Sequence, residues 1–182
     1  MTVMRLRTAV LPAGERAALV TGACMAAVTG FAVYRADNPL HFAMLASASL
    51  LLVALAACDL TTMLLPNRLT YPGLAAAVLL AGAWPDHSWV SSLAGGAAGG
   101  AIMLALFLLV PGFGAGDVKL CALIGLLAGW PHFGVALIAG VMVSGVVALL
   151  GLLSGRLGRR DSMPYGPGLI AGALYVLLLV RP

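Results

Sequence analysis

Two aspartates, Asp59 and Asp117, stand at the edges of long apolar runs. Asp59 ends the run Leu50–Cys58, and Asp117 follows the glycine-containing stretch Val110–Gly116 and precedes another apolar run. An ionisable group near membrane depth is costly unless it faces protein or water, so both aspartates are candidate functional residues. The other acidic residues fall in predicted loops, where a charge costs little: Glu15, Asp37, Asp86 and Asp161.

A pair of carboxylates that shares one site can hydrolyse a peptide bond. Repulsion separates their protonation steps, so one is ionised and activates water while the other is protonated and protonates the amide. This reaction needs no metal ion. Glycines at positions 112, 114 and 116 would let the backbone pass close to an extended substrate. Simpler interpretations stay open: Asp117 could cap the next helix, Asp59 could end its own helix at the membrane interface, and the glycines could form a plain turn.

Helix ends predict which aspartate ionises first. Asp117 begins a helix, where the positive end of the macrodipole favours a carboxylate, whereas Asp59 ends one, where the negative end disfavours it. The bias is about 0.3–1 kcal/mol at an exposed helix end. We therefore expect Asp117 to be the base that activates water and Asp59 to hold the shared proton as the acid.

The composition places these residues in a membrane protein. Of the 182 residues, 62% are hydrophobic and 9% are charged, against about 25% charged in ordinary soluble domains. The net charge is +4, but the basic residues stand singly between apolar runs, so they do not predict a nucleic-acid surface. The cysteines form no CxxC pair and no zinc spacing, and we expect all of them to be small buried residues: Cys24, Cys58 and Cys121.

About twenty apolar residues span a bilayer, and seven runs are candidates. One carries Pro72 in its first turn, and two are short, because one contains Lys119 and the other stops at Arg181. Glycines four apart, such as Gly95 and Gly99, predict close helix packing inside the bundle. We predict an all-α bundle of seven membrane helices: Ala17–Tyr34, Leu40–Cys58, Leu69–Trp84, Trp89–Val110, Val118–Trp130, Phe133–Leu153 and Pro167–Val180.

The basic residues predict the orientation of this bundle. With the N-terminus inside, only Arg35 and Arg181 lie outside, and the cytoplasmic side receives Arg5, Arg7, Arg16, Arg68, Lys119, Arg156, Arg159 and Arg160. This asymmetry follows the positive-inside rule. The segments 59–68, 111–118 and 154–166 are then cytoplasmic, so both aspartates lie at the cytoplasmic ends of their helices.

Three short motifs stand in order along the chain. Asp59 is followed after six residues by Pro66-Asn67, with Leu65 where an Ile is usual; Gly114-Ala-Gly116-Asp117-Val-Lys119-Leu matches GxGDxKL; and Pro164-Tyr165-Gly166-Pro167 precedes the last helix. These motifs, with the order of the helices from Leu40 to Val180, resemble the type IV prepilin peptidases. That family comprises membrane aspartyl proteases of the GxGD class with a core of six helices.

The resemblance implies a short form of that family, without the methyltransferase insert of its long members. Residues 40–182 would be the catalytic membrane domain, after a basic N-terminus and an extra helix over residues 1–39. Asp59 and Asp117 would be catalytic, without metal or cofactor, and the substrate-binding or supporting residues would be Pro66, Asn67, Gly114, Gly116, Lys119, Pro164, Gly166 and Pro167. The substrate would be a prepilin or pseudopilin precursor with a short basic leader, cut at the cytoplasmic face of the bacterial inner membrane.

The role of Lys119 and two alternative functions of the chain can also be considered. Lys119 stands two positions after Asp117, on a different helical face, so we expect an interfacial anchor or a contact to the leader rather than an acid–base group. A proton-coupled transporter or small channel could use the same aspartates as relay groups, and a structural assembly factor is a third possibility. Replacing either aspartate by Asn distinguishes them, because only a protease loses cleavage while keeping its fold and insertion.

The charge distribution predicts a topology that labelling can test. A single cysteine placed at Arg160 should react with a membrane-impermeant thiol reagent only from the cytoplasmic side, and a C-terminal reporter should report the opposite side. Labelling of position 160 from outside, or a cytoplasmic C-terminus, would contradict the predicted layout.

Overall fold

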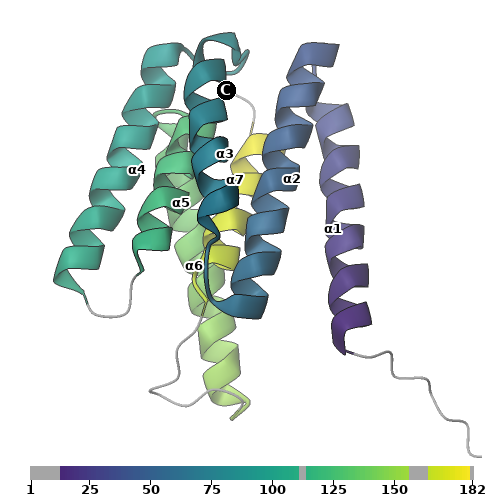
Figure 1. Ribbon diagram of the computed structural model, residues 1–182, viewed down its shortest axis with the longest axis vertical. Helices are drawn as coiled ribbons and strands as arrows, with labels where there is room; N and C mark the ends of the chain where they lie inside the picture. The colour runs from purple at the N-terminus through teal and green to yellow at the C-terminus, as the bar shows by residue number, and fades with distance from the viewer. Residues whose placement is uncertain (1–12, 111–113, 156–163, 181–182) are drawn as a thin grey trace, which may run out of the picture.

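The computed structural model describes residues 13–110, 114–155 and 164–180, with side chains from residue 18 onward. Within these ranges every regular element is helical, which confirms the predicted all-α fold (Figure 1). The helices are α1 (Ala13–Arg35), α2 (Pro39–Thr62), α3 (Asn67–Leu80), α4 (Trp89–Leu109), α5 (Ala115–Ala128), α6 (His132–Leu153) and α7 (Gly166–Leu179), with a short 3-10 helix, η1 (Ala81–Ala83), after α3.

Each predicted run corresponds to one of these helices. By length and composition, α2, α4, α6 and the Ala18–Arg35 part of α1 can cross a membrane, and α7 is a shorter apolar helix. One helix start that matters for the site differs from the prediction: α5 begins at Ala115 rather than at Val118. Asp117 therefore lies inside the first turn of α5.

The centre of the bundle is formed by α2, α5 and α7, and the other helices pack around them. α4 packs along α5, α6 along α7, and α1 along α2 at one edge of the molecule (Figure 1). The C-terminal end of α2 and the N-terminal ends of α3, α5 and α7 point toward the same end of the bundle. Fully buried side chains of the central helices include Leu45, Leu52, Leu55, Leu120, Leu123 and Ile170.

Glycines allow α4 and α5 to approach closely, as predicted. Across the interface, a Cβ added at Gly95 would collide with the backbone carbonyl of Gly125, and one added at Gly99 with that of Cys121. Gly172 likewise faces the backbone of α6 at Gly140. Two membrane helices can come this near only where small residues meet, so these glycines hold α5 and α7 in place.

The prediction that all three cysteines are buried is wrong for Cys24. Cys121 is buried and Cys58 is half-buried, but Cys24 is exposed on α1. Its neighbours on the same helix, Leu19 and Val20, are also exposed. The reason is that α1 packs at the edge of the bundle, so an apolar residue of this helix can face the lipid instead of the protein core.

A pair of adjacent glycines on α4 tests the packing. Gly99→Ala should destabilise the protein by about 1–3 kcal/mol, because the new methyl group meets the carbonyl oxygen of Cys121. Gly100→Ala is the matched control, since its Cβ would lie an ordinary 3.5 Å from the Cβ of Ala122. Unfolding in mixed detergent micelles measures both variants. Equal stability of the two would contradict the close packing of α4 on α5.

Candidate active site

Asp59 lies in the last turns of α2, and its carboxylate is held by the start of α7. The side chain is only 6% exposed, and Oδ2 accepts a hydrogen bond of 3.1 Å from the backbone N–H of Gly166. A Cβ at position 166 would lie 2.5 Å from the same oxygen. Only glycine leaves room for the carboxylate here, which gives Gly166 a supporting role.

The end of α2 brings the next motif back toward Asp59. Met63 adopts a left-handed conformation with φ 52°, and its N–H donates to the carbonyl of Asp59 at 2.8 Å. The chain then turns, and α3 begins at Asn67, directly after Pro66. The carbonyl of Pro66 accepts from the N–H and the hydroxyl of Thr70 at 3.1 and 2.8 Å. Pro66 therefore helps to start α3 and to position Asn67.

Asp117 does cap α5, as one of the simpler interpretations allowed. Its Oδ2 accepts from the N–H of Gly114 at 2.9 Å, and its own N–H donates to the carbonyl of Gly114 at 3.0 Å. Beside it, a Cβ at Gly116 would lie 3.2 Å from the Cβ of Leu65, so the α2–α3 loop rests directly on the start of α5. Asp117 is half-buried.

The two aspartates line one cavity of about 510 Å³ at this end of the bundle. Its walls are the end of α2 with the α2–α3 loop, the first turns of α5, and the segment before α7. The lining residues are Asp59, Met63, Leu64, Leu65, Asn67, Gly114, Ala115, Gly116, Asp117, Lys119, Pro164 and Tyr165.

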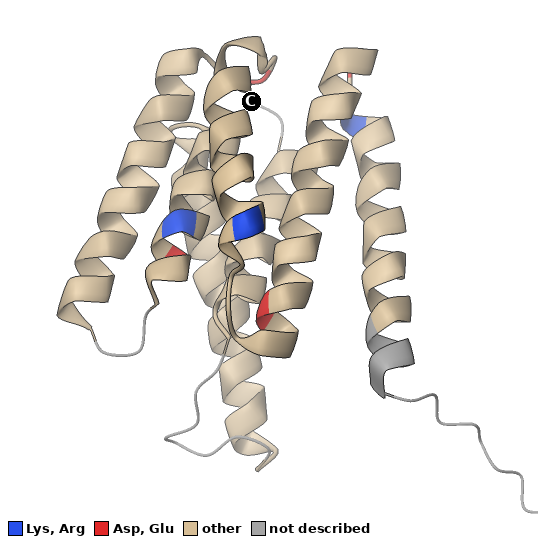
Figure 2. Cartoon of the chain, in the orientation of Figure 1, with Lys and Arg blue, Asp and Glu red and all other residues tan. Residues whose placement is uncertain are grey.

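Most of the residues singled out in the sequence meet in this cavity. Pro66, Gly166 and Pro167 do not line it; Pro66 and Gly166 support it through the contacts above, and Pro167 stands in the first turn of α7. Gly112 lies outside the described residues. In Figure 2, charged positions lie around mid-height in the view on α2, α3 and α5, and again near the tops of α1, α2 and α3.

Lys119 lines the same cavity as Asp117 despite the two-residue offset. Its Nζ donates to Oδ1 of Asn67 at 2.8 Å and lies 4.7 Å from the ring centroid of Tyr71. Sequence reasoning missed Tyr71, although it stands four residues after Asn67 and thus on the same face of α3. The hydrogen bond and the cation–π contact both join α3 to α5.

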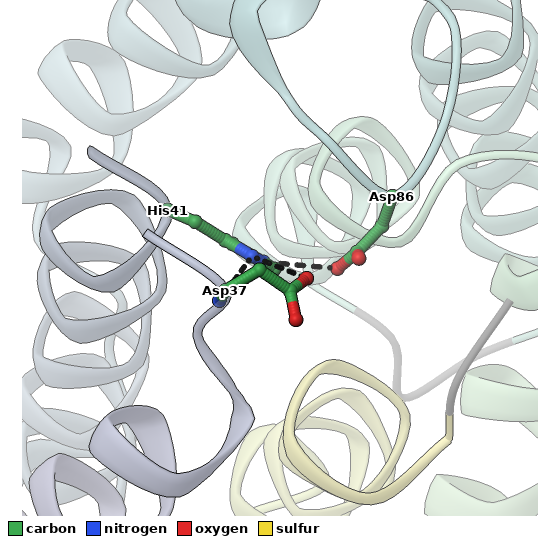
Figure 3. A group of neighbouring side chains, drawn as sticks. All are labelled: Asp37, His41 and Asp86. Carbon is green, nitrogen blue, oxygen red and sulfur yellow. Dashed lines mark hydrogen bonds and ion pairs between the residues drawn. The ribbon is translucent and has the colours of Figure 1, made fainter. Parts of the chain in front are cut away.

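A second polar cluster lies at the opposite end of the bundle and was also missed. Arg35 Nη2 donates to Asp86 Oδ1 at 2.8 Å. His41 Nε2 lies 3.2 Å from Asp86 Oδ2, and His41 Nδ1 lies 3.5 Å from Asp37 Oδ2 (Figure 3). Arg35 and His41 are buried, and Asp86 is 16% exposed. Asp86 lies in the loop before α4, as expected, and its ion pairs also join this loop to the end of α1 and the start of α2.

Ion pairs within this cluster join its charged groups, although Nε of Arg35 is buried without a hydrogen-bond partner among the described residues. Ligand-type atoms of Asp37, His41 and Asp86 lie within 4.8 Å of one another, a spacing that could hold a metal ion. The guanidinium of Arg35, however, already compensates Asp86, and a second cation beside it would be repelled. The cluster is best described as an ionic contact between helix ends.

Comparisons with known proteins relate the chain to leader peptidases. The model of the type IV leader peptidase family matches residues 45–152. The chain is 35% identical over 133 residues to a prepilin leader peptidase/N-methyltransferase of Bacillus subtilis (strain 168), which covers 70% of this chain and 52% of that protein. It is 31% identical over 138 residues to one of Burkholderia pseudomallei (strain 1026b), covering 72% and 44%. The chain thus spans about half the length of these relatives. No solved structure gives a significant match.

Proposed function

Because the chain belongs to the type IV leader peptidase family, we propose that it is an aspartic endopeptidase of the bacterial inner membrane. Its substrates are prepilin or pseudopilin precursors, whose short basic leader it removes at the cytoplasmic face. The observation that carries the proposal is that Asp59 of α2 and Asp117 of α5 line one cavity. Two carboxylates facing the same space are the groups that metal-independent hydrolysis of a peptide bond requires.

The cavity supports a division of labour between the aspartates. Asp117 is the more exposed of the two and lies at the positive end of α5, so it accepts a proton from water as the water oxygen attacks the scissile carbonyl. Asp59 donates its proton to the carbonyl oxygen. When the C–N bond breaks, the proton on Asp117 passes to the leaving nitrogen, and Asp59 regains its proton from the collapsing diol.

Contacts in the structure refine this division. Oδ2 of Asp59 accepts from the N–H of Gly166, which leaves Oδ1 to carry the shared proton. The same contact places Asp59 at the N-terminus of α7, where the dipole favours a carboxylate. The helix dipoles therefore favour ionised Asp117 over ionised Asp59 by less than α2 and α5 alone would suggest. The assignment of Asp117 as the base rests mainly on its access to water.

The walls of the cavity suit an extended peptide. Gly114 and Gly116 bring no side chains to the start of α5, and Leu64 and Leu65 add apolar side chains to the lining. Lys119 and Arg68 are both on the predicted cytoplasmic side of the membrane, where basic residues are favoured. A precursor whose apolar helix lies in the membrane would present its leader junction at this depth.

Two Asn variants test the proposal in cells that coexpress a candidate pilin precursor. Asp59→Asn and Asp117→Asn should each lower the rate of leader removal by at least about 100-fold, the scale of general acid–base catalysis, while insertion and thermal stability are kept. Lys119→Ala, at a residue that we place outside the acid–base chemistry, should retain measurable cleavage. The mass of the precursor, with or without its leader, is the readout.

The same experiment separates the other interpretations. A folded aspartate variant that still cleaves would end the aspartic mechanism. If the unmodified chain moves protons but leaves every precursor intact, the transporter interpretation replaces the protease.

A further inference from the structure

An apolar groove runs along the membrane flank of the bundle between α1, α2 and α7. Its volume is about 300 Å³. The residues that matter here are Cys24, Ala27 and Phe31 of α1, Ala56 of α2, and Pro167 and Ala171 of α7. The lining has no charged side chain, and it is separate from the cavity that holds the aspartates.

One end of this groove lies about one helical turn from Asp59. Ala56 stands three residues before Asp59, so the two lie on neighbouring turns of one face of α2. Pro167 follows Gly166, whose N–H donates to Asp59. The groove continues along α7 to Leu174, eight residues beyond Gly166, which corresponds to about 12 Å of helix at 1.5 Å per residue.

The outer wall of the groove is α1, and the C-terminal half of this helix is attached to the bundle. Ala32 and Val28 are buried against the core. At the end of α1, Arg35 is paired with Asp86 of the loop before α4, and Asp86 also contacts His41 of α2 (Figure 3). The groove is therefore bounded by a fixed helix, although α1 lies outside the residues that match the family model.

We propose that this groove binds one face of the apolar helix of the precursor whose leader enters the cavity. The proposal rests on the proposed function and adds where the rest of the substrate lies. Small residues on each wall, Ala27, Ala56 and Ala171, let a further membrane helix approach closely. A helix seated there ends beside Asp59, so the junction between helix and leader reaches the aspartates without bending into the core.

Two tryptophan substitutions on α1 test this role. Ala27→Trp fills the groove, and Ala26→Trp is the matched control, since Ala26 is exposed on the same helix and is not part of the lining. Each variant is assayed in proteoliposomes with the intact precursor and with a soluble peptide that contains the leader junction but not the apolar helix. Ala27→Trp should raise KM for the intact precursor at least 10-fold and leave kcat/KM for the peptide unchanged, with Ala26→Trp altering neither.

The outcomes separate the two proposals. Equal effects of Ala27→Trp and Ala26→Trp, or equal loss on both substrates, would overturn the role of the groove while the protease stands. Failure of the unmodified protein to cut the intact precursor would instead overturn the proposed function.

A native thiol gives an independent test that does not depend on the peptide. Cys24 lines the groove and is exposed. In an Asp117→Asn protein with Cys58→Ala and Cys121→Ala, a thiol oxidant should link Cys24 to single cysteines on one face of the precursor's apolar helix, because a disulfide requires Cα atoms within about 7 Å. Moving the thiol to position 26 (Cys24→Ala with Ala26→Cys) should abolish the link. Links only between two copies of this chain, or no link in either protein, would overturn the proposal.

Discussion

The structure depends on holding two carboxylates together at the edge of an apolar bundle. Burying an unpartnered polar group is unfavourable, and each aspartate is supported by a backbone N–H from a helix start: Gly166 for Asp59 and Gly114 for Asp117. These donors carry no charge and no side chain, so they stabilise the carboxylates without filling the cavity between them. Each donor is a glycine, and at position 166 a Cβ would displace the carboxylate that it holds.

Helix packing decides where these N–H groups stand. α5 approaches α4 through Gly95, Gly99 and Gly125, and α7 approaches α6 through Gly140 and Gly172. The two helices whose starts carry the donors are thus held by contacts deeper in the bundle. The hydrogen bond from Lys119 to Asn67 also connects α5 to α3 at the cavity itself. The cavity is consequently a property of the whole bundle, and α1 adds a groove on its flank.

Much of this fold could be predicted from the sequence, because the length and polarity of an apolar run are local properties. The seven helices and the cap formed by Asp117 follow from residues close in the chain. The contact of Asp59 with Gly166, 107 residues away, does not, since it depends on how two helices cross. The pairing of Arg35 with Asp86 and the exposure of Cys24 were missed for the same reason: charge and hydropathy patterns do not say which helix borders α1. The roles of the supporting motif residues were implied by the family resemblance, and the contacts show where Gly114 and Gly166 lie relative to the aspartates.

Crosslinking between the two aspartate positions tests the central claim most directly. In a protein with Cys24, Cys58 and Cys121 replaced by Ala, Asp59→Cys with Asp117→Cys should be joined by a short bifunctional thiol reagent. Leu65→Cys with Gly116→Cys is the positive control, because their Cβ atoms would lie 3.2 Å apart, and Asp37→Cys with Asp117→Cys, at opposite ends of the bundle, is the negative control. The shared cavity predicts efficient linking of positions 59 and 117; linking of the positive control alone would contradict it.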